Sequence, residues 1–263
     1  MPGHLRIHTP NAKQRTLLLQ CEDGTQCYVE IDKGVHGNPG KHWFYRSKPP
    51  PESEDKTTHI FKVATHDQGL MREISVVRTL ARLVRDGNTA LQDACVIPDK
   101  LPEHGWQLPR FVGSMLYGSD LFEHVCDASN LGRDGMPPFS RHETKTIVMS
   151  LLEAVSVLHR VTLAHGDIKL ENIVMLKPCQ GVRLIDFECS SDLLQAVPAQ
   201  TDTGGTKIHY PPELWLASPE QAYSRHANRS KVDSWCVAQV IYTLLCCRGL
   251  PAGPEALVST YSL

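Results

Sequence analysis

Four side chains with useful chemistry lie close together in residues 165–174, just ahead of an apolar run. They are a histidine, an acid, a cation and an amide: His165, Asp167, Lys169 and Asn172. A carboxylate can accept a proton from a hydroxyl group, and an ammonium group can neutralise a phosphate. An amide oxygen can help to hold a magnesium ion. The chemistry that this stretch could carry is therefore proton transfer beside a phosphate and a metal.

A long helix and a hairpin are expected to position this loop. Residues 140–143, Ser-Arg-His-Glu, form a capping box, and apolar residues then recur at helical spacing to about Arg160. After the loop, apolar runs at 173–176 and 182–185 flank turn residues and predict a β-hairpin. These two elements can attach the polar loop to a core.

The loop resembles the catalytic loop of protein kinases, whose pattern is H-R-D-L-x-x-x-N. Here residues 165–172 read H-G-D-I-K-L-E-N, with Gly166 at the position of the family's arginine. The resemblance implies that Asp167 orients or deprotonates the acceptor hydroxyl and that Lys169 neutralises phosphate charge. Because Gly166 removes the arginine that pairs with an activation-segment phosphate, activity is expected not to depend strongly on such phosphorylation.

A second acidic residue follows the predicted hairpin directly, in Asp186-Phe187-Glu188. A carboxylate leaving a strand beside the amide of Asn172 is what a bridging magnesium ion needs. The three residues resemble the kinase D-F-G motif, which implies that Asn172 and Asp186 hold Mg²⁺ and that Phe187 packs beneath them. Glu188 replaces the family's glycine and adds negative charge at this point.

Residues 204–213 read Gly-Gly-Thr-Lys-Ile-His-Tyr-Pro-Pro-Glu and resemble the end of a kinase activation segment, G-T-x-x-Y-x-A-P-E. The resemblance implies structural roles for Thr206 and Glu213. Thr206 is expected to hydrogen-bond near Asp167 and Lys169, which would link peptide docking to the catalytic loop. Lys169 and Thr206 together favour serine or threonine over tyrosine as the acceptor.

Residues 231–245 are hydrophobic nearly all round, which predicts a helix buried on every side. They resemble the kinase helix that opens with D-x-W-S-x-G. Asp233 is expected to cap the start of this helix and to accept hydrogen bonds from the backbone of His165 and Gly166. The resemblance thus gives His165 a structural role.

The first half of the chain offers a cation and an acid on neighbouring elements. Residues 58–64 predict a strand that carries Lys62, and residues 67–86 predict a helix with Glu73 beside its apolar stripe. The kinase resemblance pairs the two side chains to position the α- and β-phosphates of ATP. The alternative is that both charges simply face solvent, as most do.

The turn between strands predicted at 28–31 and 41–46 is rich in glycine. Such a turn can bring backbone N–H groups close to phosphates. Gly34 and Gly37 match the second and third glycines of the kinase pattern G-x-G-x-x-G and are expected to contact ATP, whereas Asp32 replaces the first. A plain hairpin loop is the alternative.

The order of these elements along the chain predicts an α+β, protein kinase-like bilobal fold. Its small N-lobe is mainly β with one helix, and its mainly α C-lobe stops early. The predicted limits are an N-terminal extension at 1–26, an N-lobe at 27–112, a hinge at 113–117 and a partial C-lobe at 118–263. Within the extension, the apolar run 16–21 and the Asp-Gly turn after it predict a strand or hairpin. A short strand is also expected at 94–98.

The composition of the chain limits which cellular compartments and which kinds of partner are expected. The net charge of −2, from 27 basic and 29 acidic residues, gives no reason to expect a nucleic acid or an anionic membrane as a partner. No signal peptide or apolar membrane span is found, so an intracellular protein, cytoplasmic or nuclear, is expected. The nine cysteines lack C-x-x-C spacing and are expected to be reduced thiols.

Two classes of function stay open. The first is an active Ser/Thr kinase that uses ATP and Mg²⁺ to phosphorylate a protein substrate. The second is a pseudokinase or truncated kinase-like binding module without turnover, for which Asp32, Glu188 and the short C-terminal part argue. The short C-lobe is expected to leave the helix after Asp233 partly uncovered, which invites a partner protein. A small-molecule phosphotransferase shares the fold but is disfavoured by residues 205–213.

Overall fold

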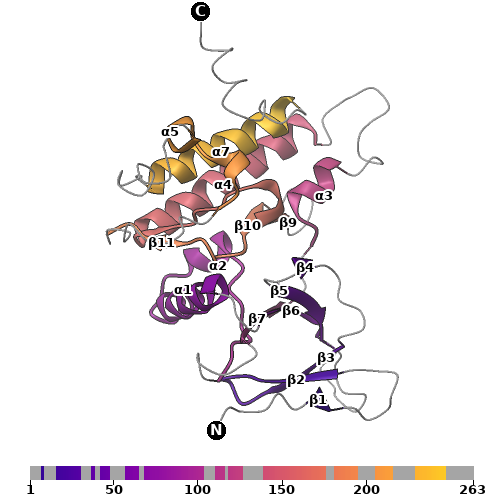
Figure 1. Ribbon diagram of the computed structural model, residues 1–263. Helices are drawn as coiled ribbons and strands as arrows, with labels where there is room; N and C mark the ends of the chain where they lie inside the picture. The colour runs from indigo at the N-terminus through magenta and orange to yellow at the C-terminus, as the bar shows by residue number, and fades with distance from the viewer. Residues whose placement is uncertain are drawn as a thin grey trace, which may run out of the picture. The chain divides into compact units, whose positions relative to one another are not determined.

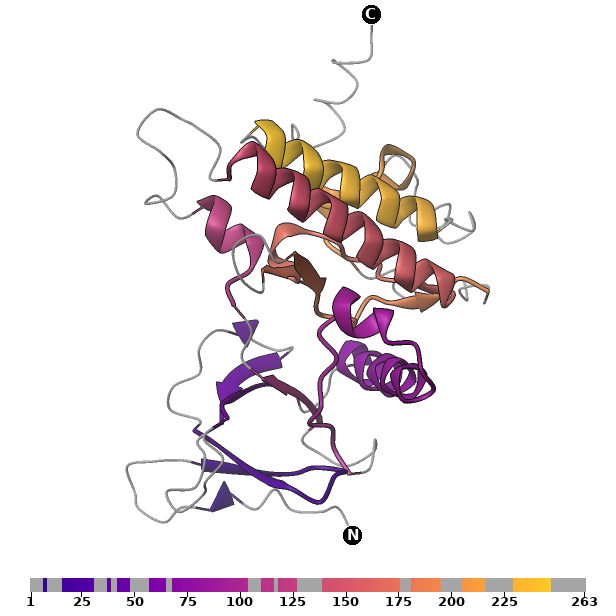
Figure 2. The ribbon, with the colours of Figure 1, turned by 180° about the vertical axis from the view of Figure 1, so that it is seen from behind.

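The computed structural model of the chain contains two compact units (Figures 1 and 2). The described residues are 7–8, 16–30, 37–38, 42–47, 57–64, 68–103, 110–115, 118–126, 139–175, 181–194, 205–215 and 229–246. The first unit comprises Met1–Arg82 and Ile97–Leu116, and the second Leu83–Val96 and Tyr117–Leu263. The predicted α+β class, with a β-rich first part and a helical second part, is confirmed. The predicted lobe and hinge limits stay predictions.

The first unit contains two antiparallel sheets. One has the order β1-β2-β3, from Ile7–His8, Thr16–Gln20 and Gln26–Glu30. The other has the order β4-β5-β6-β7, from Gly37–Asn38, His42–Arg46, His59–Ala64 and Arg110–Met115. The hairpin expected around residues 22–25 is confirmed by the β2–β3 ladder, in which Leu19 pairs with Cys27.

The glycine-rich connection departs from the expected turn between strands at 28–31 and 41–46. Strand β3 forms its ladder with β2, and the contact of β3 with the end of β5 is a single bridge from Val29 to Ser47. Gly37 and Asn38 instead form β4, which pairs with β5. The strands expected at 28–31 and 41–46 are present as β3 and β5, but the alternative of a plain hairpin between them was wrong, because β3 forms its ladder with β2 and β5 with β4 and β6. Gly34 and Asp32 lie outside the described residues.

Side chains from both sheets meet in the core of the first unit. Leu19, Cys21 and Val29 of the β2–β3 hairpin pack with Phe61, Val63 and Phe111 of the second sheet. The rings of Phe61 and Phe111 meet edge to face, with centroids 5.8 Å apart. A Cβ at Gly113 would lie 2.4 Å from Cε1 of Phe61, so a glycine is required beside that ring.

Helix α1, Gln68–Arg85, buries a stripe of Leu70, Ile74, Val77 and Leu80, as its spacing predicts. It ends in a Schellman motif, in which Asn88 N donates to Leu83 O and Gly87 N donates to Val84 O, both at 3.0 Å. Gly87 takes a φ of 105°, which suits glycine.

The prediction of a short strand at 94–98 was wrong. Residues Ala90–Ala94 form helix α2, and Cys95 makes only an isolated parallel bridge to Leu184. Val96 N adds one hydrogen bond of 2.9 Å to Leu184 O. The apolar residues of this segment, Leu91, Cys95 and Val96, are buried, so their hydrophobicity reflects packing of a helix end rather than a ladder.

The second unit is built on helices α4, Arg141–Arg160, and α7, Arg229–Cys246, which lie side by side in both views (Figures 1 and 2). The capping box of α4 is confirmed: Ser140 N donates to Glu143 Oε2 at 2.8 Å, and Glu143 N donates to Ser140 Oγ at 3.3 Å. The described part of this unit also contains α2, α3, Leu121–Cys126, and α5, Pro212–Trp215. Short 3₁₀ turns span Leu170–Asn172 and Lys207–His209.

Two small antiparallel pairs hold the loops of this unit. The predicted hairpin is confirmed as β9, Ile173–Met175, paired with β10, Val182–Leu184. The other pair joins β8, Leu163–Ala164, to β11, Ser191–Asp192. Within the described part of the chain, no helix is both long and apolar enough to cross a membrane.

Helix α7 corrects one expectation. It begins at Arg229, so Asp233 lies inside the helix rather than capping its start. Most of the α7 residues before Asp233 are polar, but Arg229 and Val232 are buried, so tertiary packing extends the helix ahead of the predicted start. The C-terminal end is not buried on every side, because Leu245 is 61% exposed and Tyr242 is 38% exposed.

Candidate active site

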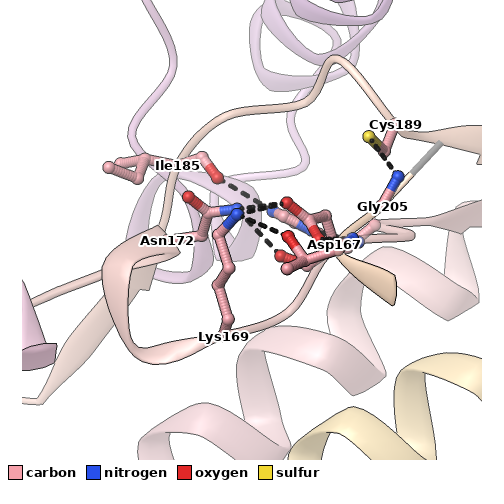
Figure 3. Close-up of polar contacts among 8 residues, drawn as sticks. Asp167, Lys169, Asn172, Ile185, Cys189 and Gly205 are labelled. Carbon is pink, nitrogen blue, oxygen red and sulfur yellow. Dashed lines mark hydrogen bonds and ion pairs between the residues drawn. The ribbon is translucent and has the colours of Figure 1, made fainter. Parts of the chain in front are cut away.

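Both carboxylate oxygens of Asp167 are held by hydrogen bonds (Figure 3). Lys169 Nζ donates to Oδ2 at 2.8 Å, and the backbone N of Thr206 donates to Oδ1 at 2.7 Å. Asn172 Nδ2 donates to Oδ2 at 3.1 Å and to the carbonyl O of Asp167 at 2.8 Å. Asp167 is only 7% exposed, so these hydrogen bonds are largely shielded from water and hold the carboxylate in one orientation.

Lys169 joins the catalytic loop to the segment around Thr206. Its Nζ also donates to Thr206 Oγ1 at 2.8 Å. Desolvation alone would lower the pKa of Lys169, but the hydrogen bond and the charge of Asp167 raise it overall, with further contributions from Glu171 and Asp186. Lys169 is therefore a stable ammonium group among three acids, which is the state that can neutralise phosphate.

The side chain of Asp233 anchors the catalytic loop by accepting hydrogen bonds from the backbone of that loop. Its Oδ2 accepts a hydrogen bond from His165 N and its Oδ1 accepts one from Gly166 N, both at 2.9 Å. His159 Nε2 lies 2.9 Å from the same Oδ2. Asp233 is fully buried, and its interior position on α7 lets one carboxylate connect α7, α4 and the loop.

His165 orients the loop through its ring. Nδ1 accepts a hydrogen bond from Asp167 N at 3.3 Å, which places the ring proton on Nε2, and Nε2 then donates to Ile185 O at 2.9 Å. The ring also packs against Phe187, with centroids 5.3 Å apart. Both residues are completely buried, so the histidine serves the structure of the loop and of the segment that carries Asp186.

Gly166 permits a close approach that no other residue would allow. Its φ is 83°, and a Cβ there would lie 2.4 Å from the carbonyl O of Cys189. Ser190 Oγ donates to His165 O at 3.1 Å, and Gly205 N donates to Cys189 Sγ at 3.0 Å (Figure 3). In place of an arginine side chain, the loop thus has direct backbone packing against the segment after Phe187.

Cys189, Ser190 and Gly205 are residues of this site that were not predicted from the sequence. The pKa of Cys189 is raised to about 12 by burial and by the charges of Asp167, Glu188 and Asp186, so its sulfur is a packed thiol. The only local signal that could have found these residues is the glycine at position 166, which indicates room for a close backbone neighbour.

Asn172 and Asp186 supply the oxygen atoms that a hard divalent cation prefers. Among the described residues, the side-chain hydrogen bonds of Asn172 use its nitrogen, which leaves its amide oxygen for a metal. Ile185 N donates to Asn172 O at 3.0 Å and so ties together the two segments that carry these residues. Asp186 has a φ of 66°, an uncommon conformation for a residue with a side chain that is typical of functional sites.

The described residues contain no group of three or more His, Cys, Asp and Glu side chains that could hold a metal alone. A cation at Asn172 and Asp186 would therefore need further oxygen ligands, such as those of phosphates. Glu213 lies in α5, but its side chain is not among those that the structure describes.

In the first unit, the structure brings Lys62 and Glu73 together. Lys62 Nζ lies 3.0 Å from Glu73 Oε2, joining β6 to α1. The residues are 4% and 3% exposed, so neither charge faces solvent. Their role toward ATP remains a prediction, as does that of Gly37 in β4.

Comparisons with known proteins agree with this geometry. The family model for the protein kinase domain matches residues 111–255, more than half of the chain. The mouse phosphorylase b kinase gamma catalytic chain, liver/testis isoform, is 36% identical over 106 residues, which cover 40% of this chain and 25% of that protein. A meiosis-specific serine/threonine-protein kinase of Saccharomyces cerevisiae is 28% identical over 142 residues, covering 50% and 28%.

A probable myosin light chain kinase of Dictyostelium discoideum is 30% identical over 138 residues, covering 51% of this chain and 40% of that protein. The chain thus spans between a quarter and two-fifths of the length of these relatives. Protein kinase domains use ATP and a divalent metal, and the residues around Asp167 fit that use. By the extent of the family match, this chain belongs to the protein kinase domain family.

Proposed function

We propose that this chain transfers the terminal phosphate of ATP to serine or threonine hydroxyls of a protein substrate, with Asp167 as the catalytic base. The observation that carries the proposal is the fixed carboxylate of Asp167, whose two oxygens accept hydrogen bonds from Lys169, Asn172 and the backbone of Thr206. A carboxylate held in this way can orient an incoming hydroxyl and accept its proton as the phosphoryl group transfers.

The other charged residues have complementary roles in this proposal. Lys169 and Lys62 neutralise phosphate charge, and Glu73 holds Lys62 in position. Asn172 and Asp186 would hold Mg²⁺, which supplies charge neutralisation on the phosphates when bound. The backbone conformation of Asp186 and the hydrogen bond from Ile185 N to Asn172 O support this pairing, because they hold together the two segments that carry these residues.

Preference for serine and threonine is supported by the bridge from Lys169 Nζ to Thr206 Oγ1. The bridge and the bond from Thr206 N to Asp167 fix the segment before α5 against the base. A short acceptor side chain then has to approach the carboxylate closely. The Saccharomyces relative is named as a serine/threonine-protein kinase, which agrees with this preference.

A kinase-like binding module without turnover is the second candidate. Glu188 favours it, because this half-buried acid lies close enough to Cys189 to help raise the pKa of that thiol, in company with Asp186 and Asp167. A third negative charge at this place opposes binding of a triphosphate unless a cation compensates. The module would bind nucleotide or protein with the same loop but would not transfer phosphate.

Transfer of radiolabelled phosphate from ATP to a basic protein distinguishes these candidates. The chain, Asp167→Ala and the matched control Asp86→Ala, which removes an exposed acid, are assayed side by side with Mg²⁺. The kinase proposal predicts incorporation by the unmodified chain and by Asp86→Ala, with loss in Asp167→Ala. Thermal stabilisation by ATP and Mg²⁺ without transfer would instead establish the binding module.

A further inference from the structure

Two cysteines lie side by side on the β2–β3 hairpin of the first unit. Cys21 Sγ is 3.9 Å from Cys27 Sγ, and the Cys21 thiol donates to the Cys27 sulfur. Cys27 pairs directly with Leu19, whereas Cys21 N donates to Thr25 O at 2.9 Å, so the cysteines are diagonal neighbours on one face of the hairpin. Cys21 is buried and Cys27 is partly exposed, so one sulfur is reachable from solvent and the other stands behind it.

The surroundings favour a thiolate at Cys27. The pKa of Cys27 is lowered to about 7, first by the hydrogen bond from Cys21 and also by the charge of Lys100 and a hydrogen bond with Thr25. The same thiol–thiol hydrogen bond and burial raise the pKa of Cys21. Lys100 Nζ is held in place by Asp23 Oδ2 at 2.6 Å, and Thr25 Oγ1 donates to Asp23 Oδ1 at 2.6 Å. Asp23 of the turn thus fixes the Lys100 cation near one sulfur of the pair.

Three other described cysteines lack this combination of properties. Cys95, Cys189 and Cys236 are buried, and desolvation raises the pKa of each to about 12. Such thiols react slowly with oxidants, because the thiolate is the nucleophile. Low pKa, partial exposure and an adjacent second thiol together are the properties of redox-responsive cysteines.

We propose that Cys21 and Cys27 form a reversible redox site that hydroperoxides oxidise to a disulfide. The Cys27 thiolate attacks the O–O bond of the peroxide, which forms a sulfenic acid and releases hydroxide that takes up a proton. The Cys21 sulfur then attacks the Cys27 sulfur, the S–O bond breaks, and water leaves with the Cys21 proton. Two thiols and one hydrogen peroxide thus give one disulfide and two waters.

Formation of the bond requires a small movement of the hairpin. A disulfide has an S–S distance of about 2.05 Å, so the two sulfurs must approach each other from their separation of 3.9 Å. The five residues between the cysteines include the exposed turn at Asp23 and Gly24, which can take up part of this movement, whereas Cys21 is fixed in the core and Cys27 packs against it. Reduction by a thiol restores the free pair. This site is independent of the proposed phosphate transfer.

Peptide mass analysis of the oxidised full chain tests the proposal directly. Trypsin releases residues 16–33 as one peptide with both cysteines, and cleavage after Glu22 then separates the cysteines unless a disulfide joins them. Treatment with hydrogen peroxide, followed by alkylation of free thiols, is expected to give a peptide that lacks two hydrogens and stays joined after this cleavage. Prior reduction should abolish the linkage.

Two matched variants separate the roles of the two sulfurs. In Cys21→Ser, the Cys27 sulfenic acid should persist and be trapped by dimedone, whereas in Cys27→Ser Cys21 should remain unlabelled. At pH 7, iodoacetamide should label Cys27 in the folded chain roughly threefold faster than in an unfolded peptide of residues 20–28, given the opposing effects of ionisation and nucleophilicity. A peptide 16–33 that keeps both thiols free, or Cys27 oxidised further without linkage to Cys21, would overturn the proposal.

Discussion

The loop around Asp167 and the pair Lys62–Glu73 hold buried charges in different ways. Asp167 and Asp233 accept several hydrogen bonds each, many of them from backbone N–H groups of the loop and of Thr206. Lys62 and Glu73 connect β6 to α1 through one buried ion pair. The difference is that charge in the second unit is distributed over a network that orders a loop, whereas in the first unit a buried ion pair joins a strand to a helix.

Breaking the Lys62–Glu73 ion pair should have the largest effect on stability. Lys62→Met leaves Glu73 charged and buried, which is expected to lower the free energy of unfolding by about 3–5 kcal/mol. The double variant Lys62→Met with Glu73→Leu removes both charges and should recover most of this loss. Urea denaturation followed by circular dichroism measures both; a single variant as stable as the unmodified chain would contradict the contrast.

The network is expected to give a somewhat smaller loss when one anchor is weakened. Asp233→Asn keeps the shape of the side chain but replaces one acceptor oxygen with a donor that faces His165 N or Gly166 N. The expected cost is about 2–3 kcal/mol in unfolding free energy, from one lost charge-assisted bond and one mismatched donor. Asp192→Asn, at a half-buried position in the same unit, is the control and should cost less than about 1 kcal/mol.

The backbone packing of the network can be isolated with two glycines. Gly166→Ala should cost about 2–3 kcal/mol, because it combines a positive φ with a Cβ 2.4 Å from the Cys189 carbonyl. Gly87→Ala has a positive φ with nothing within 4 Å of its Cβ and should cost only about 1 kcal/mol. The difference in unfolding free energy reports the approach of Cys189 alone. Equal costs would mean that this approach contributes nothing.

Alkaline pH should produce the smallest change. The folded pKa of Lys169 is raised above its unfolded value of 10.5, so its contribution to stability is fully present below that pH. The contribution is lost as the pH rises through the folded pKa. Unfolding free energy should therefore fall above about pH 10.5 more steeply in the unmodified chain than in Lys169→Met. Parallel pH profiles for the two proteins would show that the shift does not stabilise the fold.

Local chemistry explains which parts of the fold could be predicted. The capping box at Ser140 and Glu143, the turn before Thr25 and the stop at Gly87 depend on residues within a few positions of one another. The side chains around Asp167 could be named because their types and spacing match one chemistry. Lys62 and Glu73 could be paired because the predicted strand and helix resemble the kinase elements whose lysine and glutamate form an ion pair.

The errors concern partners that are distant in the sequence. Whether β3 pairs with β2 or with β5 depends on the whole sheet, and the apolar segment at 94–98 packs without forming a strand. The start of α7 at Arg229 and the contact of Cys189 with Gly166 arise from tertiary packing. The residues concerned show no periodic pattern or turn signal that marks the start of α7 or the contact with Cys189, so these two features were not predicted from the sequence.

The central claim is that Asp167, oriented by its network, is a catalytic base. Phosphate transfer to a serine-containing protein by Asp167→Asn, compared with the unmodified chain at saturating ATP and Mg²⁺, tests it most directly. Asparagine keeps the shape but cannot accept the proton, so kcat should fall by about 10²–10⁴-fold while thermal stabilisation by ATP persists. Equal kcat values for the two proteins would contradict the claim.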